Sequence, residues 1–466
     1  MTAHSASPDH PAGRKLYQAA CILIIVVLVA VFPAASSADN DEPDWTRLEN
    51  DRSIVAGPAL SDLIARAQRD NPAIAAARLS WRAAVEDYRV ASNFPDPRLS
   101  ASYPTETRIG DEEWQIALSQ PLPLPGQLDA QGEAATADIH LARLTYEKTV
   151  RDQTIEVRQS AHELIYLQQA IAIAAGNRDL LDQLMASGRA AYARERTSLI
   201  DLSRAAAQSG QLQYDEQLLA ELARTERTRL NALLNRAPDA AIGTLVPPLF
   251  SPITHSLDEL YRLVEENGVD VLLARAELEK AEREVTLARY RTLPEVDVGL
   301  FVNSIAEADP LTDNGRTGIK AVGATVSLSL PIWIDKNQGR MTASRTRVEQ
   351  AKAEVTKRVN EARAAVSRLF FRVGNAARLI ALYRDELMPE AAKSLETAET
   401  WFREGKGSLS DFTETRTVWY TFQLAMARSQ ADYGQNLAAL EGLIGRDLTT
   451  AGSQTPPVST DTKEVK

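Results

Sequence analysis

An internal repeat constrains this chain more than any other feature of its sequence. Three groups of residues recur at a constant offset of 210 positions. The groups are Leu118, Ser119 and Pro121 with Leu328, Ser329 and Pro331; Ser198, Leu199 and Asp201 with Ser408, Leu409 and Asp411; and Leu230, Leu233 and Arg236 with Leu440, Leu443 and Arg446. An offset that holds over such a distance predicts two copies of one folding unit.

The offset is shorter near the start of each copy. Asn71 matches Asn267 after 196 positions, and Pro97 matches Pro294 after 197. The difference falls between two predicted strands, where the second copy has the longer connection, over residues 303–320. An insertion in an exposed hairpin loop costs little free energy. We therefore expect the same unit in both copies.

Helical patterns dominate each copy. The predicted elements are a first helix at residues 61–91 and 257–291, a very long helix at 128–189 and 338–402, and return helices that end near 235 and 444. Apolar residues between Val348 and Ile380 recur about every 3.6 residues, close to the straight-helix and coiled-coil periods. A helix of ~60 residues extends ~90 Å, and Pro389 is expected to bend the second one.

Two short alternating segments follow the first helix of each copy. They lie at residues 97–103 and 114–120, and at 295–302 and 322–330. In the last segment, Val322, Ala324 and Val326 alternate with small or polar residues, so one face of the strand is apolar. This pattern suits a barrel with lipid outside and water inside, or an amphipathic sheet on a soluble core. The fold class is mainly α with a small β part, a duplicated helix–β-hairpin–long helix–helix unit.

The first 38 residues are expected to be a cleaved signal peptide. Arg14 and Lys15 precede an apolar run over residues 19–32, and small residues lead to Ala38, where the cut is placed. A retained anchor is the alternative, although the run is short for a membrane span of ~20 residues. Cys21 is the only cysteine and lies before the position of a lipid-modified cysteine, so we do not expect lipidation.

Charge and missing motifs exclude several classes of function. The net charge of −11 argues against nucleic acid, whose phosphates are bound by Lys and Arg. No apolar run after Phe32 approaches the length of a membrane helix. After processing, the histidines are His140, His162 and His255, which lack metal-ligand spacing. We found no nucleophile or phosphate-loop motif, so we expect no enzyme, no cofactor and no metal site.

The predicted strands require more than one chain. Four strands cannot close a membrane barrel, which needs at least ~8. Open strand edges in lipid would leave backbone groups without hydrogen-bond partners. Several copies must therefore pool their strands if the sheet is in a membrane, although this reasoning does not determine how many.

The ordered set of features resembles the TolC-type outer-membrane efflux family over residues 60–446. The resemblance is carried by the duplicated layout, by Asn71-Pro72 near the first helix start, and by the turns followed by Ser-Leu-x-Asp. It implies a homotrimer with an α-helical periplasmic tunnel and a twelve-stranded barrel in outer-membrane lipid. The implied partners are a periplasmic adaptor protein and an inner-membrane pump of the RND type. The junction over residues 120–127 is most similar to heavy-metal efflux members.

The internal repeat and the local composition also predict an organisation of the chain. An N-terminal segment at residues 39–57 would follow the signal peptide. The repeats would cover residues 58–236 and 256–446, separated by a Pro-rich equatorial linker at 237–255. Residues 447–466 are polar and are expected to form a disordered tail.

Candidate site residues cluster at the turns that precede the return helices. Ser198 and Ser408 are predicted to cap those helices, each with an aspartate three residues later. By resemblance, Asp411 and Glu414 form the pore constriction, as two stacked acidic rings that attract cations. The alternative is a solvated helix face. Adaptor contact is assigned by resemblance to Thr197, Ser198, Leu199, Gly405, Gly407, Ser408 and Leu409.

The gate departs from the family pattern. Where members of the family often have an arginine that locks the closed entrance, this chain has Gly407, and where they often have a tyrosine, it has Phe402. Asp201 keeps its place, but without those two partners. The bonds of the closed state are therefore not predicted from the resemblance.

Three functional hypotheses follow. The first is an outer-membrane conduit of a tripartite efflux system that passively conducts substrates, heavy-metal cations among them. The second is a type I protein-secretion or multidrug duct of the same fold. The third, from another class, is a soluble periplasmic coiled-coil scaffold.

Overall fold

The computed structural model describes residue 54 and residues 57–103, 112–193, 198–248, 250–305 and 320–449. These residues belong to one compact unit, 51–466. The predicted signal peptide, Thr197 and the predicted tail beyond Thr449 lie outside the described residues.

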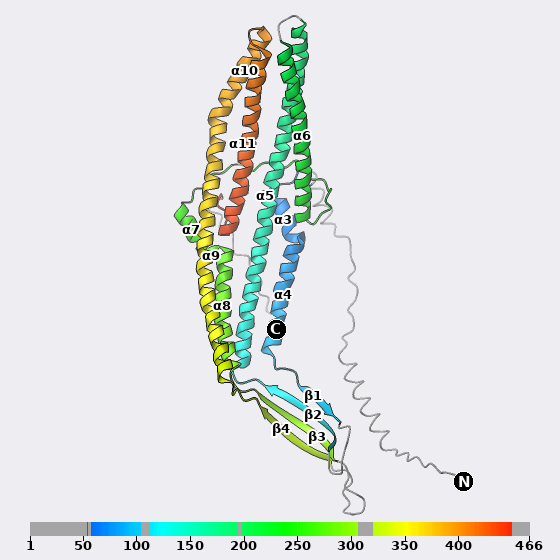
Figure 1. The fold of residues 1–466 in the computed structure, drawn as a ribbon, viewed down its shortest axis with the longest axis vertical. Helices are drawn as coiled ribbons and strands as arrows, with labels where there is room; N and C mark the ends of the chain where they lie inside the picture. Colours follow the sequence, from blue (N-terminus) through cyan, green and yellow to red (C-terminus); the bar gives the residue numbers. More distant parts are fainter. Residues whose placement is uncertain are drawn as a thin grey trace, which may run out of the picture. The chain divides into compact units, whose positions relative to one another are not determined.

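The second half of the unit repeats the element order of the first (Figure 1). The first half contains α3 (Leu60–Asp70), α4 (Pro72–Ser92), β1 (Arg98–Ser102), β2 (Glu112–Leu122), α5 (Gln127–Tyr192) and α6 (Leu199–Leu233). The second contains α7 (Leu257–Asn267), α8 (Val269–Tyr290), β3 (Val296–Ile305), β4 (Lys320–Leu328), α9 (Ile334–Leu382), the π-helical turn η1 (Tyr383–Leu387), α10 (Met388–Glu404) and α11 (Leu409–Ile444).

The first helix of each copy is broken, so the predictions of one helix at 61–91 and one at 257–291 are wrong. Asn71 has an extended backbone, with φ −68° and ψ 125°, and its side chain accepts hydrogen bonds from the Ala73 and Ile74 amides. A residue before proline avoids the helical region, and Pro72 then starts α4 at a position where no amide hydrogen is needed. Gly268 breaks the second copy in the same extended conformation.

The first long helix, predicted over residues 128–189, is confirmed as α5 with 66 residues. The second, predicted over residues 338–402, is divided into α9 with 49 residues, η1 and α10. The π-helical turn η1 lies directly before Met388 and Pro389, where the proline ring cannot follow a regular helix. None of the described helices is both long enough and apolar enough to cross a membrane.

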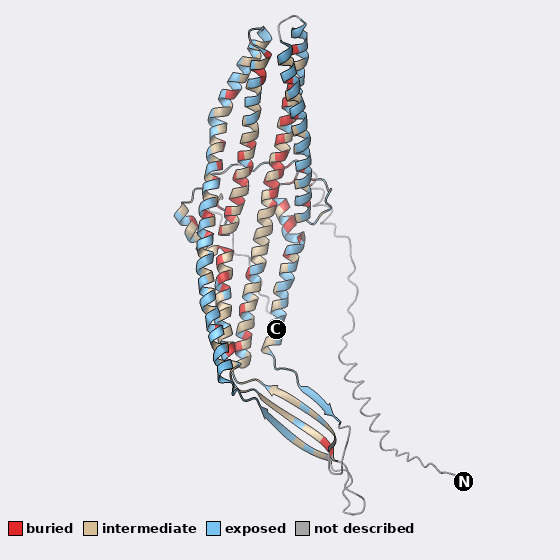
Figure 2. Cartoon of the chain, in the orientation of Figure 1, coloured by how far each residue is buried: buried red, intermediate tan, exposed pale blue. Residues whose placement is uncertain are grey.

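Helix α5 packs against α4, α6, α8 and α11, and so joins the two halves of the unit. Two apolar cores result. One contains Leu63, Leu164 and Leu230 of the first half, and the other contains Leu260, Val366 and Leu440 of the second. Buried residues are numerous along the helices and scarce in the sheet (Figure 2).

The sheet has four antiparallel strands in the order β1-β2-β3-β4. Leu99, Leu118, Leu300 and Ala324 form one cross-strand row, and Ser100, Ala117, Phe301 and Gly323 form the next. Because side chains alternate along a strand, the first row lies on an apolar face and the second on a face of mostly small or polar residues. Among the described strands, β1 and β4 each pair along one edge.

Candidate functional site

The turn between α10 and α11 is built by its glycines. Gly405 has φ 73°, a left-handed conformation that favours glycine at a helix C-terminus. The amides of Lys406 and Gly407 both donate to the Trp401 carbonyl, at 2.9 and 3.1 Å. A Cβ on Gly407 would come within 3.2 Å of the Trp401 Cβ. The turn is therefore tight, and a long side chain at position 407 would require it to shift.

Ser408 starts α11 with a capping box, as the sequence predicts. The Asp411 amide donates to Ser408 Oγ at 3.0 Å, and the Ser408 amide donates to Asp411 Oδ2 at 3.2 Å. Ser198 also caps α6, by accepting from the Asp201 amide at 3.1 Å. The Ser198 hydroxyl donates to Asp201 Oδ2 at 2.8 Å. Asp201 therefore accepts a hydrogen bond from the side chain of its serine, whereas Asp411 accepts one from the backbone amide of Ser408.

Asp411 and Glu414 are both exposed on the first turns of α11. Asp411 lines a groove of about 380 Å³ between α10 and α11, together with Lys393, Trp401 and Thr415. Neither carboxylate forms an ion pair with another described residue. Within the described part of one chain, both carboxyl groups therefore lie at the surface without a cationic partner.

Phe402 belongs to an apolar cluster that holds the two helical hairpins together. Its ring lies 6.2 Å from the ring of Phe412, centroid to centroid. The cluster also contains Leu181 of α5, Ala205 and Leu212 of α6, and Leu409 of α11. A Cβ on Gly188 of α5 would meet Leu202 and Leu409 side-chain carbons at 3.0 and 3.2 Å. Phe402 thus packs in a core, where a tyrosine hydroxyl would need a partner.

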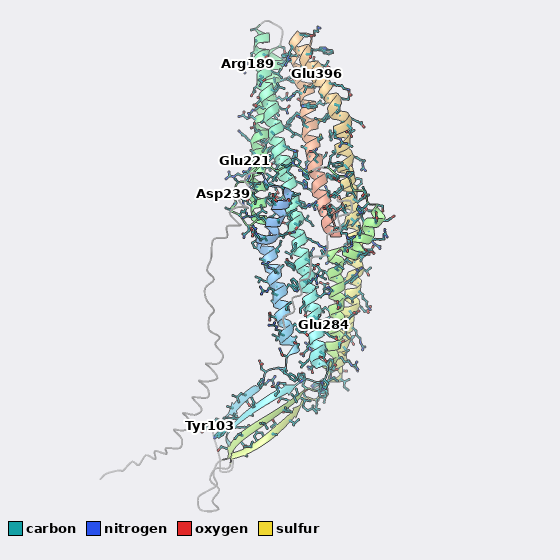
Figure 3. All side chains as sticks on the ribbon, turned by 180° about the vertical axis from the view of Figure 1, so that it is seen from behind. Tyr103, Arg189, Glu221, Asp239, Glu284 and Glu396 are labelled. Atoms are coloured by element: carbon teal, nitrogen blue, oxygen red, sulfur yellow. The ribbon has the colours of Figure 1, made fainter. Side chains whose placement is uncertain are left out.

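The predicted gate neighbours do not share a described contact. Asp201 is bonded to Ser198, Phe402 packs in the apolar cluster, and Gly407 lies against Trp401. The adaptor-contact residues from Ser198 to Leu199 and from Gly405 to Leu409 lie at the two turns. Figure 3 labels Arg189 of α5 and Glu396 of α10 at this same end of the helices.

Three residues of this region were missed by the sequence analysis. Ile200 and Trp401 expose 65% and 56% of their surface beside the two turns. Arg416 of α11 is half-buried and its Nε has no hydrogen-bond partner among the described residues. Burial lowers the pKa of Arg416, and Glu399 opposes that change. The apolar residues beside the capping serines were a usable sequence signal, whereas the burial of Arg416 was not.

The sheet is the second candidate region. Leu300 exposes 64% of its surface and Val326 exposes 76%, on the apolar face. Tyr103 and Trp333, exposed by 78% and 69%, follow the strands at opposite ends (Figure 3 labels Tyr103). Phe301 is also aromatic, but its side chain lies on the other face of the sheet. The face therefore presents aliphatic side chains to the surroundings, with aromatic residues near its ends.

No cluster of at least three His, Cys, Asp or Glu side chains suited to a metal ion occurs among the described residues. The exposed carboxylates near the turns include Asp411 and Glu414 of α11 and Glu396 of α10.

Residues 260–446 match the family model described as "Outer membrane efflux protein". The chain is also similar to the cobalt-zinc-cadmium resistance protein CzcC of Cupriavidus metallidurans. The two are 23% identical over 364 residues, which cover 76% of this chain and 81% of the relative. The sequence match therefore includes most of both proteins.

Solved structures share the fold. The outer membrane protein VceC from Vibrio cholerae is 18% identical and has a TM-score of 0.67, covering 84% of this chain and 96% of its own. The structure of CusC is 14% identical and has a TM-score of 0.68, covering 89% and 95%. At this identity the likeness extends to the architecture of helices and sheet.

Proposed function

Since this chain is an outer-membrane efflux protein of the TolC type, we propose that three copies of it form one channel. Four strands from each copy would close a twelve-stranded barrel in the outer membrane. The long helices would continue from the barrel as an α-helical tunnel in the periplasm. The two repeats are proposed to be residues 58–236 and 256–446, with the linker at 237–255.

The observation that carries this proposal is the sheet of a single chain. One face exposes aliphatic side chains such as Leu300 and Val326, and exposed apolar surface of this kind is normally covered. Both outer strands have an unpaired edge among the described strands, and such edges are not stable in lipid. Neighbouring copies would satisfy the edges, and lipid would cover the apolar face.

The turns at the opposite end of the helices are proposed to meet a periplasmic adaptor. Exposed apolar residues beside both turns, Leu199, Ile200 and Trp401, support a contact with another protein. The proposed adaptor residues are Thr197, Ser198, Leu199, Gly405, Gly407, Ser408 and Leu409. An inner-membrane pump of the RND type would then deliver the substrate.

Asp411 and Glu414 are proposed to form the constriction of the channel. Their carboxylates are exposed and have no ion-pair partner among the described residues, so three copies would create two rings of negative charge. Such rings attract cations and disfavour anions. Asp201, Phe402 and Gly407 would lie near the gate, where the Ser198 hydroxyl donates a hydrogen bond to Asp201.

The function is passive conduction of substrates from the pump and adaptor to the exterior. The family consists of channel proteins, and we propose no catalytic step in this chain. Heavy-metal cations are the proposed substrates, supported by the similarity to a cobalt-zinc-cadmium resistance protein. Acidic rings at Asp411 and Glu414, as proposed above, would suit such cations. A multidrug or protein-secretion duct of the same fold is the alternative.

Disulfide trapping tests the closed barrel. The outer strands β1 and β4 are separated by three strand spacings within a chain, about 14 Å, which is too far for a disulfide. Cysteines are placed at Ser100 and, one at a time, at Ala321, Gly323, Thr325 and Ser327, which share the polar face. One pair is expected to give a covalent trimer in outer-membrane fractions.

A matched control uses the opposite face of the same strand. Ser100→Cys combined with Val326→Cys places the two thiols on different faces of the sheet and should crosslink poorly. If no polar-face pair gives a product larger than the monomer, the closed trimeric barrel is wrong. Recovery of the chain in the periplasmic fraction would instead favour the coiled-coil scaffold.

The tolerance of a deletion strain to metals and drugs tests which substrate is exported. Deletion of the gene is expected to lower tolerance to cobalt, zinc or cadmium, and expression of the chain should restore it. A strain with unchanged metal tolerance and lowered drug tolerance would identify a multidrug duct. Loss of a secreted protein, with all tolerances unchanged, would contradict efflux altogether.

A further inference from the structure

A pocket of about 260 Å³ lies between α5 and α11, under the linker that joins the two repeats. Its walls include Arg158 and His162 of α5, Gln430 and Gly434 of α11, and Pro248 and Phe250 of the linker. It therefore draws on both halves of one chain. The site is separate from the helical turns and from the sheet.

His162 is the main polar group of this pocket. Its side chain is buried, with 6% of its surface exposed. A Cβ on Gly434 would come within 2.2 Å of His162 Cε1 and within 2.4 Å of Nδ1, so the imidazole lies against the α11 backbone. Neither ring nitrogen has a hydrogen-bond partner among the described residues. Neither nitrogen is among the fully buried atoms without a partner, so the ring reaches the open space of the pocket, where a ligand could bond to it.

The cationic group of the pocket is Arg158, which already has one carboxylate partner. Among the lining residues, Arg158 is the charged one. Its Nη2 lies 2.6 Å from Glu441 Oε2, and Glu441 is outside the pocket lining. Burial, together with the charge of Arg158, lowers the pKa of His162 to about 4. The imidazole is then neutral and presents one donor and one acceptor.

The linker wall is held in place by side chains. The Tyr433 hydroxyl donates to the Ser251 carbonyl, and the Phe250 ring lies 4.7 Å from the Tyr433 ring, centroid to centroid. The Gln168 amide donates to the Gly243 carbonyl at 3.2 Å and its oxygen accepts from the Leu245 amide at 3.0 Å. The pocket is therefore formed before any ligand binds, as ligand sites usually are.

We propose that this pocket binds a compact aromatic monocarboxylate. Its ring would lie against Pro248 and Phe250, and its carboxylate would face His162 and Arg158. The volume falls just below the ~300 Å³ at which pockets for drug-sized ligands begin, so a single ring fits. Because α5 and α11 belong to different repeats, a bound ligand would bridge the two halves of the chain.

Fluorine NMR on the purified, detergent-solubilised full chain tests this assignment, with 4-fluorobenzoate as the probe. Saturable binding is expected, weakened about tenfold or more in His162→Leu, which removes the hydrogen bond to an anion. Ser160→Ala is the matched control, because Ser160 is a buried α5 residue outside the pocket lining. Gln430→Trp, at an exposed rim position, fills the pocket without altering its buried wall.

Several outcomes would overturn the proposal. They are no saturable binding to the wild-type chain, equal affinity in Gln430→Trp, and equal affinity in a folded His162→Leu. If 4-fluorotoluene or 4-fluorophenol bound as tightly as 4-fluorobenzoate, the pocket would not recognise a carboxylate. Binding seen only with a chain that ends at Thr449 would mean that the chain's own C-terminal residues fill the pocket. Since the site lies within one chain, these results are independent of trimer formation.

Discussion

The ring of Phe301 lies over Gly323, its cross-strand neighbour, on the polar face of the sheet. A Cβ at position 323 would come within 2.3 Å of Phe301 Cζ, so the ring occupies the space that a side chain would need. In the proposed barrel this face is the inner one, and three copies would present three phenyl rings to the lumen.

Removal of this ring should widen the lumen. Phe301→Ala is expected to raise the single-channel conductance in planar bilayers, because an apolar ring is replaced by water. Leu300→Ala, on the opposite face, is the control and should leave the conductance unchanged. An increase in both variants, or in neither, would contradict the assignment of the polar face to the lumen.

The charge of the constriction can be removed while the helix cap is kept. Asp411→Asn with Glu414→Gln is expected to reduce the preference for cations, because both acidic rings disappear while the new carboxamide oxygen at position 411 still accepts the Ser408 amide bond. Reversal potentials in a salt gradient measure this change. Glu396→Gln, an exposed carboxylate of α10, is the control. Unchanged selectivity in the double variant would mean that Asp411 and Glu414 line a solvated face.

The cap at Ser408 should contribute measurably to stability. Ser408→Ala removes the acceptor of the Asp411 amide bond and is expected to cost about 1 kcal/mol. Ser408→Asp should retain most of the stability that the cap contributes. Ser410→Ala changes a neighbouring serine with no described side-chain bond, and should lower the stability less than Ser408→Ala. Thermal unfolding measures the differences, and limited proteolysis at the α10–α11 turn localises them. Equal losses at 408 and 410 would refute the role of the cap.

The neutral His162 predicts a loss of stability in mild acid. Its pKa is about 4 in the folded chain, against about 6.5 in an unfolded one. Above pH 6.5 the imidazole is neutral in both states and its contribution is complete. Between these values the unfolded chain binds a proton that the folded chain excludes. The free energy of unfolding therefore decreases as the pH is lowered from 6.5 to 4, by about 3 kcal/mol in total.

Thermal unfolding at pH 7.5 and 5.0 tests this expectation. His162→Gln cannot titrate, so its unfolding temperature should fall less between the two pH values than that of the wild type. Glu441, whose pKa is raised mainly by burial, is present in both proteins and its effect cancels. The same fall in both proteins would assign the acid sensitivity to other groups.

The sequence by itself determined the duplicated order of elements, the positions of the strands and the cap at Ser408. These features have local causes. Alternation sets the faces of a strand, helical spacing sets the long helices, and a serine with an aspartate three residues later sets a helix start. The candidate residues at the turns were also found from sequence, although their role still rests on the proposed trimer.

Only the tertiary structure decided the features that join distant segments. The pairing of His162 with Gly434, the placement of Phe301 over Gly323 and the burial of Arg416 all depend on residues far apart in the chain. The breaks at Asn71 and Gly268 had local signals, yet the breaks persist because α3 and α7 pack against α5 and α9. Such contacts are selected by close packing of surfaces, which no single stretch of sequence specifies.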